Sequence, residues 1–169
     1  KGWARNPIDL FLLRRMEKER VLPAPPADRR ALIRRVCFDL VGLPPTPQKV
    51  QALVAADDLP QAWEAVVDRL LESEHFGERW ARHWLDLVGY ADQVGTSNNV
   101  FAEHAWRYRD YVIDSLNNDK PFDRFIREQI AGDLLPFESV EERAQNLVAT
   151  GFLVLGDIEI VEADKEKLL

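Results

Sequence analysis

The sequence contains a single cysteine, Cys37, among 169 residues. One thiol excludes an internal disulfide framework, a cysteine zinc cluster and covalent haem attachment through a C-x-x-C-H motif within these residues. No run of eighteen apolar residues occurs, which excludes a membrane-spanning helix. Glycine-rich phosphate loops and the G-x-S-x-G and H-E-x-x-H motifs are also missing. Motifs therefore point to no familiar catalytic or cofactor-binding class.

Charge and composition describe an acidic globular domain. Hydrophobic residues make up 46% of the chain and charged residues 30%, which supplies a core and argues against disorder. The net charge of −7 argues against nucleic acid as a partner. Residues 1–35 hold ten Lys and Arg against four Asp and Glu, whereas the remainder is acidic by thirteen charges. This asymmetry indicates either an attraction between the two parts or a neighbour, or a solvated basic face on the first helices.

Prolines and capping residues divide the chain into helices. Asn6-Pro7 and Thr46-Pro47 are typical helix starts, Asp28 and Ser139 can cap two more, and Gly42 is placed to end a helix. We expect helices over residues 7–20, 28–41, 47–56, 60–71, 78–92, 104–117, 121–132 and 139–150. The predicted fold is all-α, a single compact domain of seven or eight helices with little or no β-structure.

Three other segments have weaker patterns. Residues 93–103 lack periodicity and contain Gly, Thr, Ser and two Asn, so we expect a long loop, which in a compact domain is often functional or mobile. Residues 153–160 could form a small hairpin around Gly156-Asp157. Residues 163–169 resemble the start of a helix. The first residues look like the start of a piece of a longer protein, and we expect the domain to continue beyond Leu169.

The helix expected over 78–92 carries the first candidate site residues. Trp80, Trp84, Leu87 and Ala91 form one predicted apolar stripe. A polar stripe lies beside it, within about 60° around the helix, and we expect it to be partly buried. Its residues are Arg79, His83, Asp86 and Tyr90. Buried polar groups need partners.

The next two helices supply such partners, because Arg109, Gln129 and Asp133 lie on otherwise apolar faces. In a structural interpretation, Arg109 pairs with Asp86 or Asp133 and fixes the helix register. In a functional one, His83 and Asp86 are a base with its orienting carboxylate, or two metal ligands, and Arg109 binds an anion. The six residues His83, Asp86, Tyr90, Arg109, Gln129 and Asp133 are therefore a candidate polar cluster with no assigned catalytic role. We assign no metal site, because two ligands do not make one.

Three single residues have simpler interpretations. Cys37 shares an apolar helix face, which indicates a buried and unreactive thiol. Arg29 is expected to lay its stem along the surface of its helix. Trp106 is the best candidate for an exposed ring.

Long stretches of the chain resemble a known family. They are NPIDLFLLRRMEKE, ADRRALIRRVCFDLVGLPPTP, ERWARHWLDLVGYAD, AWRYRDYVIDSLNNDKPFDRFIREQIAGDLLP and NLVATGFLVLG. In this order they are similar to the planctomycete cytochrome-associated domain family of unknown function. The resemblance implies a large exported protein, because members of this family look like such proteins and often carry a cytochrome c-like domain. They typically continue into a C-x-x-C-H-type segment, which this chain does not reach.

The resemblance implies a location and partners more than an activity. We expect a helical module of an exported, periplasmic or envelope protein that supports electron transfer or assembly and is not catalytic alone. Its partners would be other domains of the same polypeptide, including a cytochrome c-like domain. These residues would bind no cofactor, although the longer protein could hold haem c. The alternative is an enzyme domain, acting for example on polysaccharide, with the His/Asp/Arg residues as its site.

Overall fold

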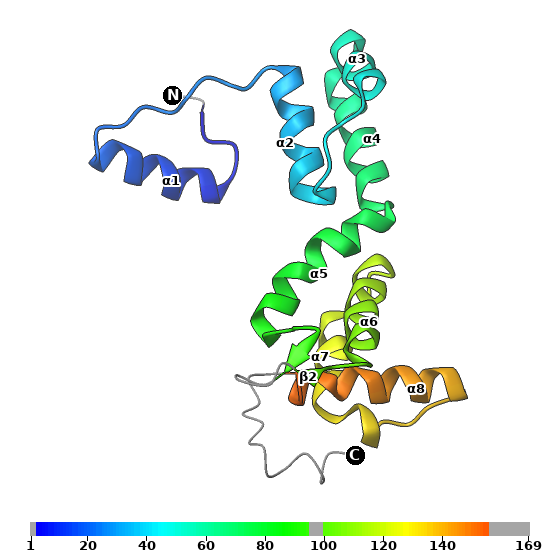
Figure 1. Ribbon diagram of the computed structural model, residues 1–169. Helices are drawn as coiled ribbons and strands as arrows, with labels where there is room; N and C mark the ends of the chain where they lie inside the picture. Colours follow the sequence, from blue (N-terminus) through cyan, green and yellow to red (C-terminus); the bar gives the residue numbers. More distant parts are fainter. Residues whose placement is uncertain (1–2, 95–99, 156–169) are drawn as a thin grey trace.

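The computed structural model describes residues 3–94 and 100–155 and confirms the all-α prediction. This described part contains eight α-helices, whose arrangement can be followed in Figure 1. They are α1 Pro7–Lys18, α2 Arg29–Val41, α3 Pro47–Ala55, α4 Leu59–Leu71, α5 Glu74–Val88, α6 Ala105–Asn117, α7 Phe122–Ala131 and α8 Val140–Ala149. Two short 3₁₀ turns, η1 Gly132–Leu134 and η2 Thr150–Leu153, follow α7 and α8. Described residues contain no helix long and apolar enough to cross a membrane.

The predicted capping residues begin their helices. The Asn6 side chain accepts a hydrogen bond from the Asp9 backbone N–H, and the Asp9 carboxylate bonds back to the Asn6 N–H. In α2, α3 and α8 the cap side chain likewise accepts a hydrogen bond from a backbone N–H of the first turn. These cap residues are Asp28, Thr46 and Ser139. The helix starts therefore follow directly from side-chain oxygens that satisfy free N–H groups.

The boundaries of α5 differ from the predicted span of 78–92. The helix begins four residues earlier, at Glu74, and ends at Val88. Gly89 takes a left-handed conformation with φ of 70° and ends the helix. The sequence did not indicate this end, because the apolar pattern continues to Ala91. The predicted loop that follows contains an antiparallel pair of two-residue strands, β1 Gln93–Val94 and β2 Val100–Phe101.

The buried face of α5 also differs from the predicted tryptophan stripe. Gly77, Ala81 and Val88 are the buried residues of this helix, whereas Leu87 is 72% exposed. The face is rotated from the predicted one because the small residues Gly77 and Ala81 let α6 approach closely. A Cβ on Gly77 would lie 2.6 Å from the Ile113 carbonyl oxygen.

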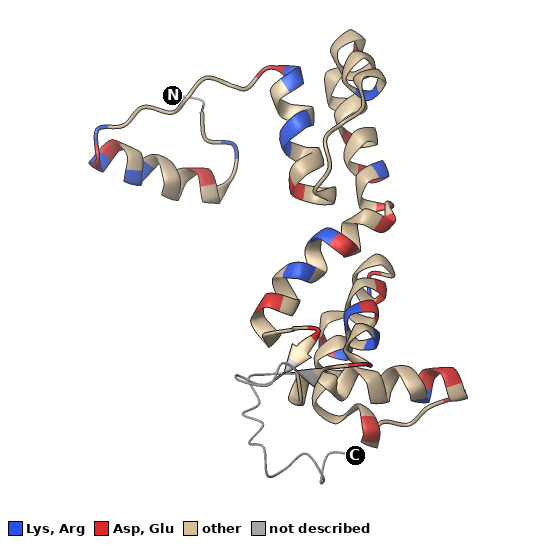
Figure 2. Ribbon diagram, viewed as in Figure 1, with Lys and Arg blue, Asp and Glu red and all other residues tan. Residues whose placement is uncertain are grey.

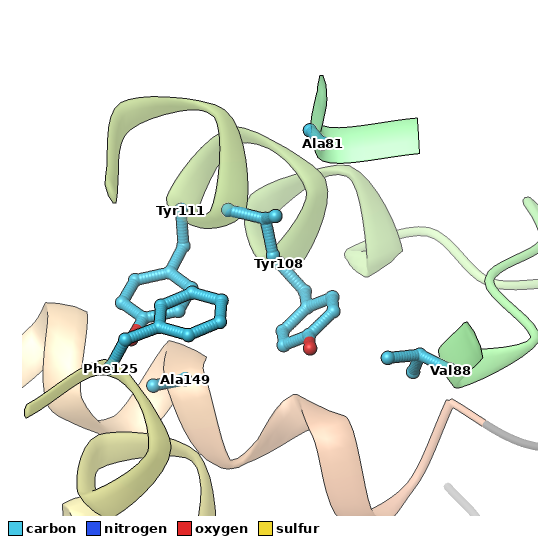
Figure 3. Close-up of a cluster of buried hydrophobic side chains, with 7 residues drawn as sticks. Ala81, Val88, Tyr108, Tyr111, Phe125 and Ala149 are labelled. Carbon is cyan, nitrogen blue, oxygen red and sulfur yellow. The ribbon is translucent and has the colours of Figure 1, made fainter. Parts of the chain in front are cut away.

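Two hydrophobic clusters hold helices α2 to α8 together. One joins α2, α3 and α4 through Ile33, Cys37, Leu53, Val66 and Leu70. The other joins α5, α6, α7 and α8 through Ala81, Val88, Tyr108, Tyr111, Val112, Phe125 and Ala149. Figure 3 shows this second cluster, in which the rings of Tyr111 and Phe125 stack. Helix α5 contacts both α2 and α6 and so links the two clusters.

The predicted burial of Cys37 is confirmed, since its side chain is 2% exposed. Burial raises the pKa of its thiol, and the nearby Lys49 charge only partly offsets this rise. Trp106 is partly exposed, as predicted. The hairpin turn expected at Gly156-Asp157 and the helix expected over 163–169 lie outside the described residues.

Arg29 does more than lie along its helix. Its guanidinium donates hydrogen bonds to the carbonyl oxygens of Leu53, Val54 and Ala56 at the end of α3, at 3.2, 3.0 and 2.6 Å. These carbonyls have no partner within their own helix, so one side chain of α2 caps the C-terminus of α3.

We predict that Arg29→Ala lowers the free energy of unfolding by about 1.5–3 kcal/mol, because it removes charge-assisted hydrogen bonds to carbonyl groups. Urea unfolding followed by circular dichroism measures the loss. Arg30→Ala is the matched control, since Arg30 is exposed on the same turn and should change stability by less than about 0.5 kcal/mol. Equal losses in the two variants would show that the cap contributes nothing.

Candidate functional site: an aromatic pocket beside a buried ionic network

Two neighbouring polar residues of α7, Glu128 and Gln129, lie in the core and are each 1% exposed. The Glu128 carboxylate accepts hydrogen bonds from Lys120 Nζ at 2.5 Å, Arg124 Nε at 2.7 Å and Tyr111 Oη at 2.8 Å. Arg124 also reaches Glu142 of α8 at 2.9 Å. One carboxylate thus ties together α6, α7, α8 and the turn before α7.

The environment fixes the protonation states of this network. Burial alone would raise the pKa of Glu128, but the hydrogen bonds from Lys120, Arg124 and Tyr111 outweigh it and hold that pKa below its usual value. Burial, with the bond to Glu128, raises the pKa of Tyr111 well above its ordinary range. Near neutral pH Glu128 is therefore an anion and Tyr111 a neutral donor. Neither group is poised to exchange a proton, so the arrangement suits a structural role.

Gln129 forms a second network with aromatic side chains. Its Oε1 accepts hydrogen bonds from Trp84 Nε1 at 2.8 Å and Tyr108 Oη at 2.5 Å, and its Nε2 donates to the Phe125 carbonyl. Burial raises the pKa of Tyr108 to about 12, and the bond with Trp84 acts against this shift. Among the described residues, every buried side-chain nitrogen and oxygen has a hydrogen-bond partner. None is left to bind a ligand from within the core.

An aromatic pocket of about 250 Å³ opens beside these networks, between α5, α6 and α7. We call it the aromatic pocket; its lining residues are Trp80, His83, Trp84, Ser115, Leu116, Lys120, Phe122 and Phe125. Trp84 meets Phe125 edge to face at 5.0 Å, which fixes the inner wall. At the rim, Trp80 is 40% and Phe122 is 69% exposed. These two rings are uncovered, whereas Tyr108, Tyr111 and Phe125 of the neighbouring cluster are buried.

The few polar groups of the aromatic pocket are already engaged. Ser115 donates to the Tyr111 carbonyl, and Lys120 binds Glu128. The His83 ring lies edge-on to Trp80 at 5.3 Å. The pocket therefore suits an apolar group, such as a ring or branched side chain, better than a charged or polyhydroxylated one.

The structure does not bring the six residues of the predicted polar cluster together. Gln129 alone is buried. His83 is exposed and lies 3.5 Å from Arg79; Asp86 is exposed with a loose 3.8 Å ion pair to Arg82. Asp133 is exposed on η1. The prediction of a shared interior is thus wrong, because the rotated face of α5 turns its polar stripe to solvent.

Arg109 and Tyr90 do lie near each other, but at the edge of the fold. Arg109 pairs at 2.9 Å with its neighbour Asp110, and not with Asp86 or Asp133 as the structural interpretation expected. Tyr90 donates to Asp92 at 2.8 Å. Burial, then the hydrogen bond and charge of Asp92, raise the pKa of Tyr90 to about 12, while the Arg109 charge partly offsets them. A tyrosine held neutral beside a paired arginine provides no base.

Sequence reasoning missed the residue with the most polar contacts, Glu128. The available signal was the spacing of Arg124 and Glu128 by four residues, which places both on one side of α7. The partners Lys120 and Tyr111 come from other segments, and no local sequence pattern predicts that they contact Glu128. Their contact with Glu128 depends on how α6 and α7 pack together.

Comparison with protein-family models identifies the family of this chain. Residues 7–168 match the model PSCyt2, described as a protein of unknown function (DUF1549). The chain belongs to this family. No curated protein and no solved structure matches it.

The described part of this PSCyt2 domain has no cysteine pair for covalent haem attachment. Its one cysteine is buried at the centre of the α2–α4 cluster, so no cysteine pair can attach the porphyrin. Its histidines lie on the surface of α5 and before α6, with His75 bonded to Glu78. No group of three or more potential metal ligands occurs among the described residues.

Proposed function

We propose that this PSCyt2 domain is a non-catalytic helical module of a longer exported protein that carries a c-type cytochrome domain. In this proposal the module supports assembly, and through it electron transfer, by docking a neighbouring domain at the aromatic pocket. The observation that carries the proposal is the exposure of Trp80 and Phe122 at the rim of an apolar pocket whose polar neighbours are all satisfied.

Two physical arguments support docking over catalysis. Two ionisable groups next to the pocket, Glu128 and Lys120, are bound to each other, and the hydrogen bonds to Glu128 hold its pKa below the usual value. The rings of Trp80 and Phe122, in contrast, are exposed to water. Fully burying a large apolar side chain against a partner stabilises a complex by roughly 1.5–3 kcal/mol. Tryptophan and phenylalanine at the mouth of a pocket are typical of the centre of a protein interface.

Thiol labelling tests the docking site directly, because the single native cysteine is buried. Phe122→Cys places a thiol at the rim, and Leu87→Cys places an equally exposed thiol on α5 outside the pocket. We expect maleimide to react with position 122 at least about tenfold more slowly in the longer protein than in this chain alone, and with position 87 at similar rates in both. No slowing at 122, or equal slowing at both positions, would contradict the proposal.

The visible absorption spectrum of the longer protein tests the cytochrome association. We expect a haem band that disappears when the cysteines of its C-x-x-C-H motif are replaced. A colourless protein would contradict the role in electron transfer. It would not bear on the docking role, which the labelling experiment tests separately.

A further inference from the structure

Helix α1 exposes an apolar surface that nothing in the described part of the chain covers. It buries none of its twelve residues, and Ile8, Phe11 and Leu12 are exposed, Phe11 by 75%. A helix this short is marginal in water without packing of its apolar face. Yet both sides of its N-terminal capping box are formed and Pro7 begins it, so the sequence specifies a helix here. A well-specified helix with an uncovered apolar face indicates a partner.

The surroundings of this face are basic. Arg14 and Lys18 follow Phe11 by three and seven residues, which places them beside it on the helix. Residues 5–20 hold five Lys and Arg against three Asp and Glu, a net +2. One of those acids, Asp9, is used in the capping box. The partner of α1 is therefore expected to be apolar and acidic.

Residues 130–141, which run from the end of α7 through η1 to the start of α8, have that character. Ile130, Leu134, Phe137 and Val140 are exposed, Leu134 by 80%. The segment contains Asp133, Glu138 and Glu141 and no Lys or Arg, a net −3. Figure 2 shows acidic positions at the start of α8, and basic positions together with acidic ones along α1. We call residues 130–141 the acidic segment.

The two surfaces cannot meet within one chain as it is folded. Figure 1 shows α1 at the α2 side of the molecule and α8 at the opposite end. Residues 21–28, without helix or strand and containing three prolines, join α1 to α2 as an extended arm. Two copies related by a twofold axis can place each α1 on the other's acidic segment and cover both pairs of surfaces at once.

We propose that this domain forms a dimer by reciprocal exchange of α1, with Phe11 of one copy packed on the Leu134 side of the acidic segment of the other. This deepens the proposed assembly role, on which it rests, by naming a second copy as one partner. It uses neither Trp80 nor Phe122, so the aromatic pocket stays open for a different domain.

Light scattering after size-exclusion chromatography over a dilution series tests the exchange. We expect the wild-type chain to have twice its mass of 19.5 kDa at high concentration. Phe11→Glu and Leu134→Glu should each raise the dissociation constant at least about tenfold, since both place a charge in an apolar contact. Leu87→Glu, an equally exposed leucine on neither surface, is the control and should leave the dimer unchanged.

Mixing the two variants tests whether Phe11 of one copy meets Leu134 of the other, as the exchange requires. Phe11→Glu retains an intact acidic segment and Leu134→Glu an intact α1, so their heterodimer recovers one of the two contacts and should bind more tightly than either variant with itself. A monomeric wild type, a dimer that survives either variant, or no gain on mixing would overturn the proposal. Slowed labelling at position 122 with a monomeric wild type would refute the exchange and leave the docking role intact.

Discussion

Glu128→Ala is expected to lower the free energy of unfolding by about 3–5 kcal/mol, the cost of breaking a buried ion pair from one side. The change leaves Lys120, whose side chain is largely buried, and the Tyr111 hydroxyl without their acceptor. Arg124 contributes less to the loss because it is half exposed and keeps Glu142. Urea unfolding measures the change.

Two further variants separate charge from shape at this position. Glu128→Gln keeps the side-chain volume and an acceptor for Tyr111 but removes the anion, so its loss should be smaller than that of the alanine variant yet well above zero. Glu138→Ala removes an exposed glutamate from the turn before α8 and should change stability by less than about 0.5 kcal/mol. A Glu128→Ala variant as stable as Glu138→Ala would show that the network adds nothing to the fold.

The pH dependence of this effect has a defined sign. The pKa of Glu128 is lower in the folded state than in the unfolded chain, where it has the ordinary value of 4.5. Above that value both states are ionised and the stabilisation by the carboxylate is complete. As pH falls below about 4.5, the unfolded state takes up the proton first, so stability is lost. We predict that the stability difference between wild type and Glu128→Gln is constant near neutral pH and shrinks on acidification. A difference that persists in acid would assign the effect to packing.

Gly132→Ala is the second substitution with a large expected effect, about 3 kcal/mol or more. A Cβ at this position would overlap the backbone carbonyl of Asn146, where the end of α7 approaches α8. Backbone atoms cannot move aside as a flexible side chain can, so the helices would have to separate. The conformation itself is ordinary, with φ of −58°, and space alone explains the need for glycine.

Gly89→Ala is the matched control, because the two glycines are required for opposite reasons. Gly89 has open space around it but a φ of 70°, which costs an alanine about 1 kcal/mol. Thermal or urea unfolding of both variants should show the larger loss at Gly132. Equal losses would mean that α7 and α8 are not held as closely as the structure shows.

The helices were predictable because their ends are specified by single residues. Asn6, Asp28 and Thr46 cap α1, α2 and α3 as the sequence indicated, and the left-handed Gly42 ends α2. The end of α5 was missed because Gly89 lies inside a pattern that continues apolar. A capping side chain therefore predicts where a helix starts. The start of α5 was missed because Ser73, which precedes it, makes no capping hydrogen bond.

The candidate site was predicted poorly, for a reason that lies in packing. Spacing along α5 placed His83 and Asp86 beside the tryptophans, but the small side chains Gly77 and Ala81 determine which face α6 contacts. Gln129 was predicted correctly as an inward polar residue, since a single amide on an apolar face needs a partner wherever its helix packs. Glu128 escaped detection because its partners come from α6 and from the turn before α7.

Hydrogen exchange measured on this chain alone and on the longer protein tests the central claim, that the polar network is scaffold and the aromatic pocket is the surface offered to a partner. We expect equally slow exchange of the α7 amides around Glu128 in both samples. We also expect additional protection, only in the longer protein, in α5 around Trp80 and in the first turn of α7. Fast exchange around Glu128 in the chain alone, or no added protection near Trp80, would contradict it.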